Sequence, residues 1–468
     1  MSSFRKGGIL VAVLGSLVLT ATPAIAQAKT TDLDYRIDSP YASVDWNWLQ
    51  YKAGFHNHTT ESDGGNTATE MLETAYSLGF NVYAMTDHNF TNTTWDRTDT
   101  ENAQADPNYY LTTERKIELN AGVGRDGGPG MIGTGYSNEQ SRSDHLNTFW
   151  TNWNNPEGST LESKIDYVDS LTAAPGELQP VQHINHPGRY YGGSNTKPGP
   201  NGEDLGALAA TDPEKVGRYV GLFRAYPDSL VGMEIVNKVS DKDSYSDRIL
   251  WDSVLQETLP ELNVWGYAND DGHSVGALGY DYNRLLLPSL SEAEVHAAMK
   301  SGAFYSTALV AKRELGSDFK GDRTKPAPTI TNIAVDQNAD AITIEGNNYN
   351  RVEWIADGKV IATGETLDLD SVSADVDNYV RAQLIGDNGI SFTNAFGLEL
   401  NTKSNNGKFL SDTEAAAAAL ASIDRTTGDV SVVRDFGNKK GAKAFEVTIT
   451  TAEGTQVIRV DAETGAII

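Results

Sequence analysis

The hydrophobic pattern of the chain divides it into three regions. In the first, from about residue 51 to residue 315, short apolar runs alternate with segments of helical periodicity. These runs and segments predict strands at 52–56, 81–86, 130–135, 180–184 and 231–236, and helices at 68–78 and 291–300. Strands that alternate with helices predict an α/β fold with mostly parallel strand pairing.

The second region begins after a linker at 316–328. Short strands of alternating apolar and polar residues, with turn signals such as Asp357-Gly358, predict a β-sandwich accessory domain at 328–400. A second linker at 401–408 leads to the third region. A helix at 412–423 and three strands near 429–435, 444–450 and 455–461 predict an α+β module at 409–468.

The first 26 residues have the pattern of a secretory signal peptide. Arg5 and Lys6 precede an apolar run at 9–20, which is followed by Ala24-Ile25-Ala26, a small-x-small cleavage sequence. The apolar run is too short to span a bilayer, so an uncleaved membrane anchor is the weaker alternative. We therefore expect a signal peptide at 1–26, a mature chain with no membrane span, and a periplasmic or extracellular location.

Acidic residues greatly outnumber basic ones. The chain has 64 Asp and Glu residues and 37 Lys and Arg residues, a formal net charge of −27. Removal of residues 1–26 takes away two basic residues, which gives 35 − 64 = −29. Because nucleic-acid binders neutralise phosphates with Lys and Arg, this charge argues against binding of a nucleic-acid polymer through a basic surface. The chain has no cysteine, so a metal ion must be held by His and carboxylate side chains.

The eight histidines carry the clearest chemical signal. Neither C-terminal region contains one, and most lie at or just after an expected strand end, beside Asp, Glu or Asn. The segments concerned are His56-Asn57-His58, Asp87-His88, Asn138-Glu139, Asp144-His145, His183-Ile184-Asn185-His186 and Asp271-Gly272-His273. Side chains two residues apart on a strand share a face, and the carboxyl ends of parallel barrel strands converge. Together the segments therefore predict a site for divalent metals.

These motifs resemble the metal-binding motifs of the PHP (polymerase and histidinol phosphatase) superfamily over about residues 50–310. The closing segment at 290–307 resembles the end of secreted PHP-domain hydrolases. The resemblance implies a distorted (βα)7 barrel, a metal-dependent hydrolase domain at 27–315, and divalent metal ions, three per site, of Mn, Zn or Fe. It implies nine metal ligands: His56, His58, Asp63, His88, Glu139, His145, His186, Asp271 and His273.

One of these ligands has a competitor. Glu118 lies in the same long interval between His88 and His145, but we prefer Glu139 because its context, followed shortly by His145-Leu146-Asn147, is similar to the family pattern. The third region also resembles a known module: residues 410–468 are similar to a PepSY domain.

The expected chemistry is hydrolysis. A cluster of divalent ions lowers the pKa of bound water and binds the oxygens of a phosphoryl group, so a metal-activated hydroxide replaces any protein nucleophile. We expect an exported phosphoesterase that acts on small phosphate mono- or diesters. By family analogy Asp271 and Glu139 bridge metals. The departing oxygen needs a proton, which His273, His88 or a further, unassigned acid directs to it, so we expect Asp271, His273 and His88 as catalytic residues.

Two alternatives stay open. The same site would also suit hydrolysis of a carboxylic ester, amide or carbamate, since fold does not fix the substrate. Alternatively, the barrel is a non-catalytic metal- or ligand-binding protein whose C-terminal modules carry the activity.

Several further side chains have both a functional and a structural interpretation. His183 either orients His186 or belongs to the core, and Asp87 either bonds a ligand histidine or closes a turn. Glu234, which ends an apolar strand, either supports the ligands or acts as a base. We expect His296 to be structural, and ordinary surface roles for the three arginines that are candidates for binding an anionic substrate: Arg189, Arg224 and Arg313.

Overall fold

The computed structural model describes residues 34–468 except 92–94, 96–108, 155–158, 402–411, 424–428, 436–443, 452–453 and 462–465. The signal peptide predicted at 1–26 and most of the linker predicted at 401–408 lie outside the described residues. All elements below belong to the compact unit Leu33–Ile468. In the described part of the chain, no helix combines the length and the apolar character that crossing a membrane requires.

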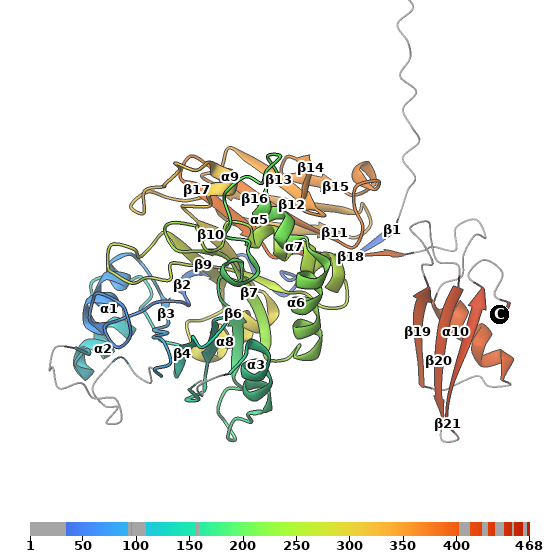
Figure 1. The fold of residues 1–468 in the computed structure, drawn as a ribbon, viewed down its shortest axis with the longest axis horizontal. Helices are drawn as coiled ribbons and strands as arrows, with labels where there is room; N and C mark the ends of the chain where they lie inside the picture. The colour runs from blue at the N-terminus through green and yellow to red at the C-terminus, as the bar shows by residue number, and fades with distance from the viewer. Residues whose placement is uncertain are drawn as a thin grey trace, which may run out of the picture. The chain divides into compact units, whose positions relative to one another are not determined.

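One sheet has five strands in the order β4-β5-β6-β7-β8. Of these, Figure 1 labels β4, β6 and β7. Its strands are β4 (Ser137–Gln140), β5 (Leu146–Phe149), β6 (Val181–Ile184), β7 (Leu230–Asn237) and β8 (Trp265–Asn269). Strands β6, β7 and β8 pair in parallel, whereas β4 with β5 and β5 with β6 are antiparallel. Every residue of β7 is buried, as expected of a central parallel strand that is covered on both faces.

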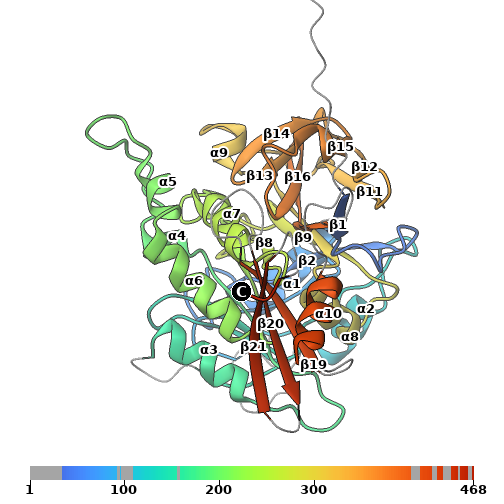
Figure 2. The same cartoon turned by 90° about the vertical axis from the view of Figure 1, so that its right-hand side faces the viewer.

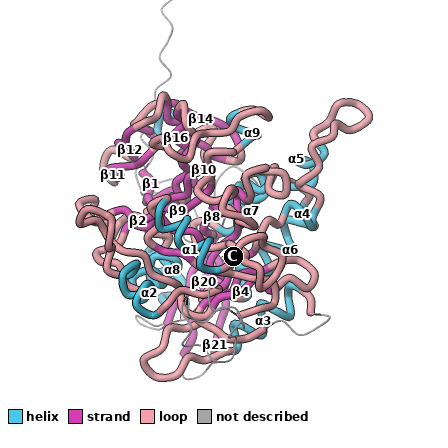
Figure 3. Tube along the Cα trace, turned by 90° about the vertical axis from the view of Figure 1, so that its left-hand side faces the viewer, coloured by secondary structure: helices cyan, strands magenta, loops and turns pink. Residues whose placement is uncertain are grey.

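Helices cover this sheet, and the apolar core lies between them and the strands (Figure 2). They are α3 (Leu161–Ser170), α6 (Pro213–Ala225) and α7 (Asp247–Thr258). Leu250 and Trp251 of α7 pack in one apolar cluster with Met233 and Ile235 of β7. Two short helices, α4 (Gly188–Tyr191) and α5 (Leu205–Ala210), follow β6, and the loop between them extends away from the helices (Figure 3).

The second sheet crosses from the first sequence region into the second. Its main order is β1-β18-β16-β17-β10-β9-β2-β3, with β13 paired to β16 and β14 to β13. The strands are β1 (Asp34–Asp38), β2 (Gln50–Gly54), β3 (Val82–Tyr83), β9 (Asp281–Leu286), β10 (Phe304–Ala308), β13 (Arg351–Ala356), β14 (Lys359–Thr363), β16 (Tyr379–Gly386), β17 (Gly389–Thr393) and β18 (Phe396–Asn401). Because β10 pairs with β17, one hydrogen-bonded sheet joins residues that the sequence assigns to two successive domains.

A three-stranded sheet packs on the second-region strands. It contains β11 (Thr329–Asp336), β12 (Ala341–Asn347) and β15 (Thr366–Asp368), and the short 3-10 helix η1 (Asp370–Val372) follows it. Its residues Ile330 and Ile342 share a buried cluster with Trp354, Val380 and Phe396 of the larger sheet. The two sheets therefore enclose a common apolar core, as in a sandwich.

The remaining helices are α1 (Ala68–Ser77), α2 (Thr113–Asn120), α8 (Glu292–Ser301) and α9 (Lys312–Leu315). Helix α1 begins where the sequence predicts it, because Thr67 and Glu70 form a reciprocal capping box. Its buried side chains Met71, Leu72 and Ala75 pack in a cluster with Phe80 and Tyr83.

The α/β class predicted from the sequence is confirmed, but two finer expectations are wrong. Among the named strands, parallel pairing is confined to β2–β3, β6–β7 and β7–β8, so the pairing is not mostly parallel. Residues 130–135 do not form a strand, and Ile132 makes only an isolated bridge to Val82. The three glycines at 130, 133 and 135, the last with a φ of 65°, weaken an extended ladder there.

The C-terminal residues form the elements that their pattern predicts. Helix α10 (Asp412–Ser422) packs on an antiparallel sheet of β19 (Asp429–Asp435), β20 (Ala444–Thr451) and β21 (Gly454–Asp461). Ala415 and Ala419 of the helix lie in one buried cluster with Phe445, Val447 and Ile449 of the central strand. The alanine run is therefore a helix face that packs closely on a sheet.

Candidate metal centre

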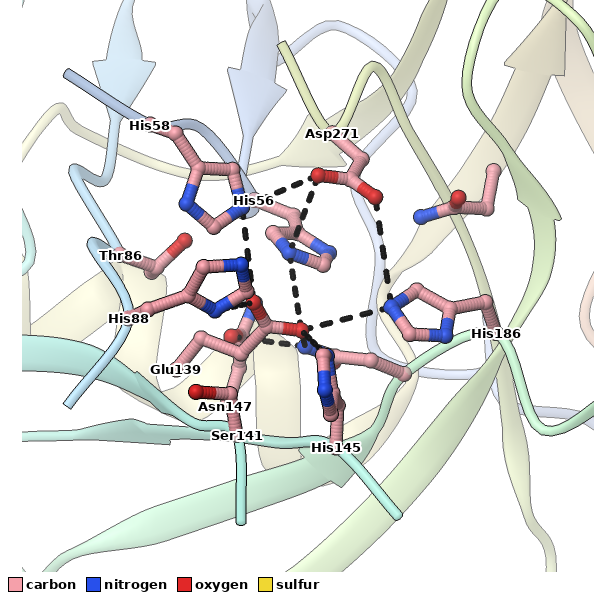
Figure 4. Close-up of polar contacts among 12 residues, drawn as sticks. His56, His58, Thr86, His88, Glu139, Ser141, His145, Asn147, His186 and Asp271 are labelled. Carbon is pink, nitrogen blue, oxygen red and sulfur yellow. Dashed lines mark hydrogen bonds and ion pairs between the residues drawn. The ribbon is translucent and has the colours of Figure 1, made fainter. Parts of the chain in front are cut away.

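The structure brings all nine predicted ligands into one cluster. Figure 4 labels all of them except Asp63 and His273. Their segments lie at strands that meet there: after β2 and β3, within β4, before β5, and after β6 and β8. Backbone contacts hold the segments in register, because Asn57 bridges Gly272 and His88 bridges Glu139. The NH of His58 also donates to the carbonyl of Gly272 at 2.9 Å.

Glu139 lies at the centre of the cluster and is completely buried. Its Oε1 is 2.8 Å from Nδ1 of His145, 3.2 Å from Nε2 of His56 and 3.4 Å from Nε2 of His186. Its Oε2 is 2.7 Å from Nδ1 of His88 and 3.5 Å from Nε2 of His58. Five imidazoles thus surround one carboxylate (Figure 4).

The competing residue Glu118 lies elsewhere. It is on α2, where its carboxylate forms an ion pair with Arg115 at 2.8 Å, and its side chain is 49% exposed. Of the two glutamates that the sequence offered, only Glu139 lies among the histidines.

Asp271 forms a second focus of the cluster. Its Oδ1 is 3.0 Å from Nε2 of His58 and 3.4 Å from both Nε2 of His56 and Nδ1 of His273. Its Oδ2 is 4.0 Å from Nε2 of His186. The side chain is only 2% exposed, and the backbone at Asp271 has a φ of 42°, in the left-handed region that non-glycine residues rarely adopt. This strained conformation lets the chain turn directly after β8 and aim the carboxylate inward.

The third carboxylate faces solvent. Oδ1 of Asp63 is 3.2 Å from Nε2 of His273, 3.6 Å from Nε2 of His88 and 3.8 Å from Nδ1 of His58. The side chain of Asp63 is 56% exposed, and those of His273 and His88 are 30% and 24% exposed. The cluster is therefore accessible from the side of Asp63, His88 and His273.

The donor atoms group as metal ligands do. Four sets have ligand atoms that all lie within 4.8 Å of one another: His58, Asp63, His88 and His273; His56, Glu139 and His186; His56, His58 and Asp271; and His88, Glu139 and His145. The sets share members, so neighbouring cations would share ligands. Histidine nitrogen with carboxylate oxygen is the donor mixture that borderline divalent metals prefer.

Several of these buried donor atoms lack a hydrogen bond within the described residues. They are Nε2 of His56 and His58, Nδ1 of His88, Oε2 of Glu139 and Oδ1 of Asp271. Some of them lie close together, such as Nδ1 of His88 and Oε2 of Glu139 at 2.7 Å, but not in the geometry of a hydrogen bond. Buried polar atoms without partners are costly, and these all face the same small space. A metal cation satisfies such lone pairs, so the residues present fit a divalent metal.

The carboxylates remain ionised in these surroundings. Burial alone raises the pKa of Glu139, but the charges of His56 and His145 outweigh it and hold this pKa well below its usual value. The pKa of Asp271 is likewise held low, against burial, by His56 and His58. Both groups are thus kept in the form that binds cations.

A buried carboxylate behind the cluster positions two of the ligands. Oε1 of Glu234 is 2.8 Å from Nδ1 of His56, which leaves Nε2 of His56 facing the cluster. Oε2 of Glu234 accepts the backbone NH of His186 at 2.8 Å, and Asn237 and Asn269 donate to the same carboxylate. Of the two interpretations of Glu234, these contacts match support of the ligands.

Other residues with two interpretations lie as follows. Asp87 accepts hydrogen bonds from the NH and hydroxyl of Thr59 and from the hydroxyl of Ser62, so it closes the turn between His58 and Asp63. His183 belongs to the core, since its ring stacks on that of Tyr267 with the two ring centres 4.7 Å apart. Burial lowers the pKa of His183 to about 4. His296 is structural, with its Nε2 2.9 Å from the carbonyl of Gln179.

The three candidate arginines differ in their contacts. Arg224 donates to the carbonyl of Glu257, and Arg313 pairs with Asp204 at 2.7 Å. Arg189 is exposed on α4. The backbone NH of Arg189 donates to the carbonyl of His186 at 3.1 Å, whereas the partners of Arg224 and Arg313 named above lie outside the cluster.

Two polar residues at the cluster were not singled out by the sequence. Nζ of Lys238 is 3.0 Å from Oδ2 of Asp271, and the ring of Tyr190 is 5.5 Å from that of His145. Burial raises the pKa of Tyr190, and the charges of Glu139, Asp144 and Asp243 raise it further. Burial lowers the pKa of Lys238, but Asp271, Asp243 and Glu139 raise it overall. Lys238 directly follows β7, and Tyr190 follows His186 by one helical turn, so position after a strand end was the available signal.

Comparison with known proteins gives little. No family model matches the chain, and no curated protein matches it. One similar solved structure is a two-domain protein from Bacteroides vulgatus that contains a predicted PHP-like metal-dependent phosphoesterase; it is 13% identical, with 89% of this chain and 96% of that chain covered and a TM-score of 0.36. Another is a lesion-specific endonuclease from Pyrococcus furiosus, which is 14% identical. The match covers 54% of this chain and 56% of that chain, with a TM-score of 0.30. Both TM-scores are below 0.5, so we draw the function from the geometry of the site.

Proposed function

We propose that this chain is a metal-dependent phosphoesterase that acts on small phosphate esters. The observation that carries the proposal is the convergence of six histidines and three carboxylates, with buried lone pairs that have no hydrogen bond within the described residues. The proposed metals are divalent Mn, Zn or Fe, three per site, held by the nine residues of the four sets. When bound, such ions supply positive charge for phosphate oxygens and activate a water molecule as the nucleophile.

Charge favours an anionic substrate. Six of the nine ligands are histidines, which bind metals as neutral groups, so only three carboxylates offset the cations. Lys238 adds a positive charge beside Asp271. A neutral ester or amide would not neutralise this positive charge, whereas an anionic phosphate ester would.

The chain's own residues would position ligands and move protons. Glu234 holds His56 and the backbone of His186, and Asp87 holds the turn that carries Asp63. In the reaction water adds to phosphorus, the bond from phosphorus to the ester oxygen breaks, and the departing oxygen takes a proton. We propose that His273 or His88 donates this proton and regains one from the attacking water, because both lie at the accessible side of the cluster. The histidine in this role carries the proton on its ring and is then not a metal ligand.

The proposal extends to the whole chain. The pattern at residues 1–26 supports export to the periplasm or the medium, with these residues removed as a signal peptide. We propose that the first region is a distorted (βα)7 barrel of the PHP type and that the C-terminal helix and three strands are a PepSY-like module. Both assignments rest on sequence resemblance.

A metal-supplemented assay with three substrates tests the function. The purified mature chain is incubated with Mn, Zn, Fe or Co and with p-nitrophenyl phosphate, bis-p-nitrophenyl phosphate or p-nitrophenyl acetate. We expect phosphoester turnover that is lost in His58→Ala and Asp271→Ala. Turnover of the acetate alone would establish the carboxylic-ester hydrolase instead, and tight metal retention without any turnover would establish a binding protein.

A further inference from the structure

Two donor groups outside the nine-residue cluster lie near His186 and Asp271. Lys238 directly follows β7, and its Nζ is 3.0 Å from Oδ2 of Asp271 and 3.9 Å from Oδ2 of Asp243. Tyr190 lies on α4, and its ring is 5.8 Å from that of His186. These donors lie on a different part of the cluster from Asp63, whose carboxylate contacts His58, His88 and His273.

The backbone of Lys238 has an unfavourable conformation. Its φ is 62°, in the left-handed region that is unfavourable for a residue with a Cβ. Its NH donates to the carbonyl of Asn269 at 3.2 Å, which ties the end of β7 to the end of β8 just before Asp271. The side chain is 27% exposed, so the ammonium group remains within reach of a ligand.

Tyr190 presents a hydroxyl without a partner. This atom is buried and makes no hydrogen bond with any residue that the structure describes. A buried donor without a partner costs roughly 1–3 kcal/mol. The ring of Tyr190 is 5.8 Å from that of His186, whose Nε2 is 4.0 Å from Oδ2 of Asp271, the atom that Lys238 contacts. The two donors therefore belong to one local environment.

We propose that Lys238 and Tyr190 bind phosphate oxygens of a monoester dianion, so that the substrate is a phosphate monoester and not a diester. This inference rests on the proposed function. A monoester carries three non-bridging oxygens and two negative charges, whereas a diester carries two such oxygens and one charge. A lysine ammonium recognises phosphate as a point charge, and a neutral hydroxyl adds a directed hydrogen bond. Compared with a diester, the monoester has one more non-bridging oxygen and one more negative charge. The ammonium of Lys238 and the hydroxyl of Tyr190, which lie outside the nine ligands, would bind them.

The test compares Lys238→Met and Tyr190→Phe with the metal-loaded wild type. The matched control is Lys242→Met, because Lys242 is an exposed lysine four residues further along the same loop. Three quantities are measured: bound metal by mass spectrometry, the Kd of inorganic phosphate by calorimetry, and kcat/KM for p-nitrophenyl phosphate and bis-p-nitrophenyl phosphate.

We expect Lys238→Met to weaken phosphate binding by about 10-fold or more, as loss of a charged hydrogen bond does. Tyr190→Phe should weaken it by about 3- to 10-fold, as loss of a neutral one does. The kcat/KM for the monoester should fall by a similar factor through KM, the diester should be affected less, and bound metal should not change. Lys242→Met should behave as the wild type.

Two results would overturn the inference. If Lys238→Met loses metal and slows both substrates equally, Lys238 only positions Asp271. If phosphate binds wild type and both variants equally, the two donors do not contact phosphate. Failure of the proposed function gives a different result: wild type hydrolyses neither phosphoester, while the phosphate-binding comparison still decides whether Lys238 and Tyr190 form the anion site.

Discussion

Nδ1 of His56 lies 2.8 Å from Oε1 of Glu234, and both side chains are completely buried. This contact fixes which imidazole nitrogen faces the cluster, because Nδ1 carries the proton that Glu234 accepts and Nε2 is left with its lone pair. Such outer contacts orient metal-binding histidines and raise their basicity.

We predict that Glu234→Gln weakens metal binding by about 10- to 100-fold, the usual effect of losing such an outer contact. The carboxylate accepts hydrogen bonds from His56, His186, Asn237 and Asn269. A neutral amide offers only one acceptor oxygen for these donors. Metal dissociation constants from competition with a chromophoric chelator give the measurement.

Glu118→Gln is the control for Glu234→Gln. Glu118 is an exposed glutamate outside the cluster, and the sequence offered it as the alternative to Glu139. This variant should bind metal as the wild type does. Equal dissociation constants for Glu234→Gln and wild type would show that Glu234 does not support the ligands.

Metal removal should destabilise the fold. A ligand that binds only the native state at about 100 times its Kd stabilises that state by about 3 kcal/mol. In a chain of this size we expect the unfolding temperature to fall by a few degrees after chelation and to recover when metal is restored, as scanning calorimetry would show. Glu139→Gln should abolish most of this difference, because Glu139 faces five of the six histidines. A variant that retains the full metal-dependent difference would remove Glu139 from the ligand set.

The candidate ligands could be predicted from sequence because most lie in short motifs near strand ends, and these motifs resemble those of a known family. His56 and His58 share a face through the two-residue period of a strand, and Asp271 and His273 flank a turn glycine. Lys238 and Tyr190 carry no such motif, and a lysine or tyrosine after a strand end is usually an ordinary surface residue. Only the folded chain shows that they lie beside the cluster.

The sheet arrangement was harder to predict for a different reason. Pairing of β10 with β17 joins residues more than eighty positions apart, as in Thr307 with Ser391, and local periodicity holds no information on such partners. The prediction of mostly parallel pairing in the first region was wrong for the same reason, since an apolar run predicts a strand but not its direction. The C-terminal elements, in contrast, pair with sequence neighbours, and their limits were predicted to within one or two residues.

A buried ion pair connects the first and second regions and should contribute strongly to stability. Asp252 of α7 and Arg381 of β16 form two contacts, at 2.6 and 2.7 Å, and their side chains are 5% and 4% exposed. We predict that Arg381→Met lowers the free energy of unfolding by about 3–5 kcal/mol, because it leaves a buried carboxylate without its cation. Urea denaturation provides the measurement.

The matched control for Arg381→Met is Arg351→Met. Arg351 pairs with Glu353 at 2.7 Å, but its side chain is 51% exposed, so its loss should cost about 1 kcal/mol or less. The double variant Asp252→Leu with Arg381→Met should recover much of the loss, since no charge is then left buried. Similar effects of Arg381→Met and Arg351→Met would mean that the buried pair does not hold the two regions together.

The core histidine His183 should make stability depend on pH. Burial lowers its pKa to about 4, whereas an unfolded histidine titrates near 6.5. Below pH 6.5 the unfolded chain therefore binds a proton that the folded chain excludes. The stability that neutral, buried His183 contributes is complete above pH 6.5 and is lost as the pH falls from 6.5 toward 4.

We predict that His183→Phe flattens the acid side of the stability profile. The aromatic ring can still stack on Tyr267, while the titrating group is gone. Between pH 7 and pH 5 the wild type should lose about 2 kcal/mol more than the variant, because each pH unit below 6.5 costs about 1.4 kcal/mol. Unfolding free energies at both pH values, measured on chelated protein so that metal release does not contribute, give this difference. Parallel profiles for the two proteins would show that His183 is protonated equally in the folded and unfolded states.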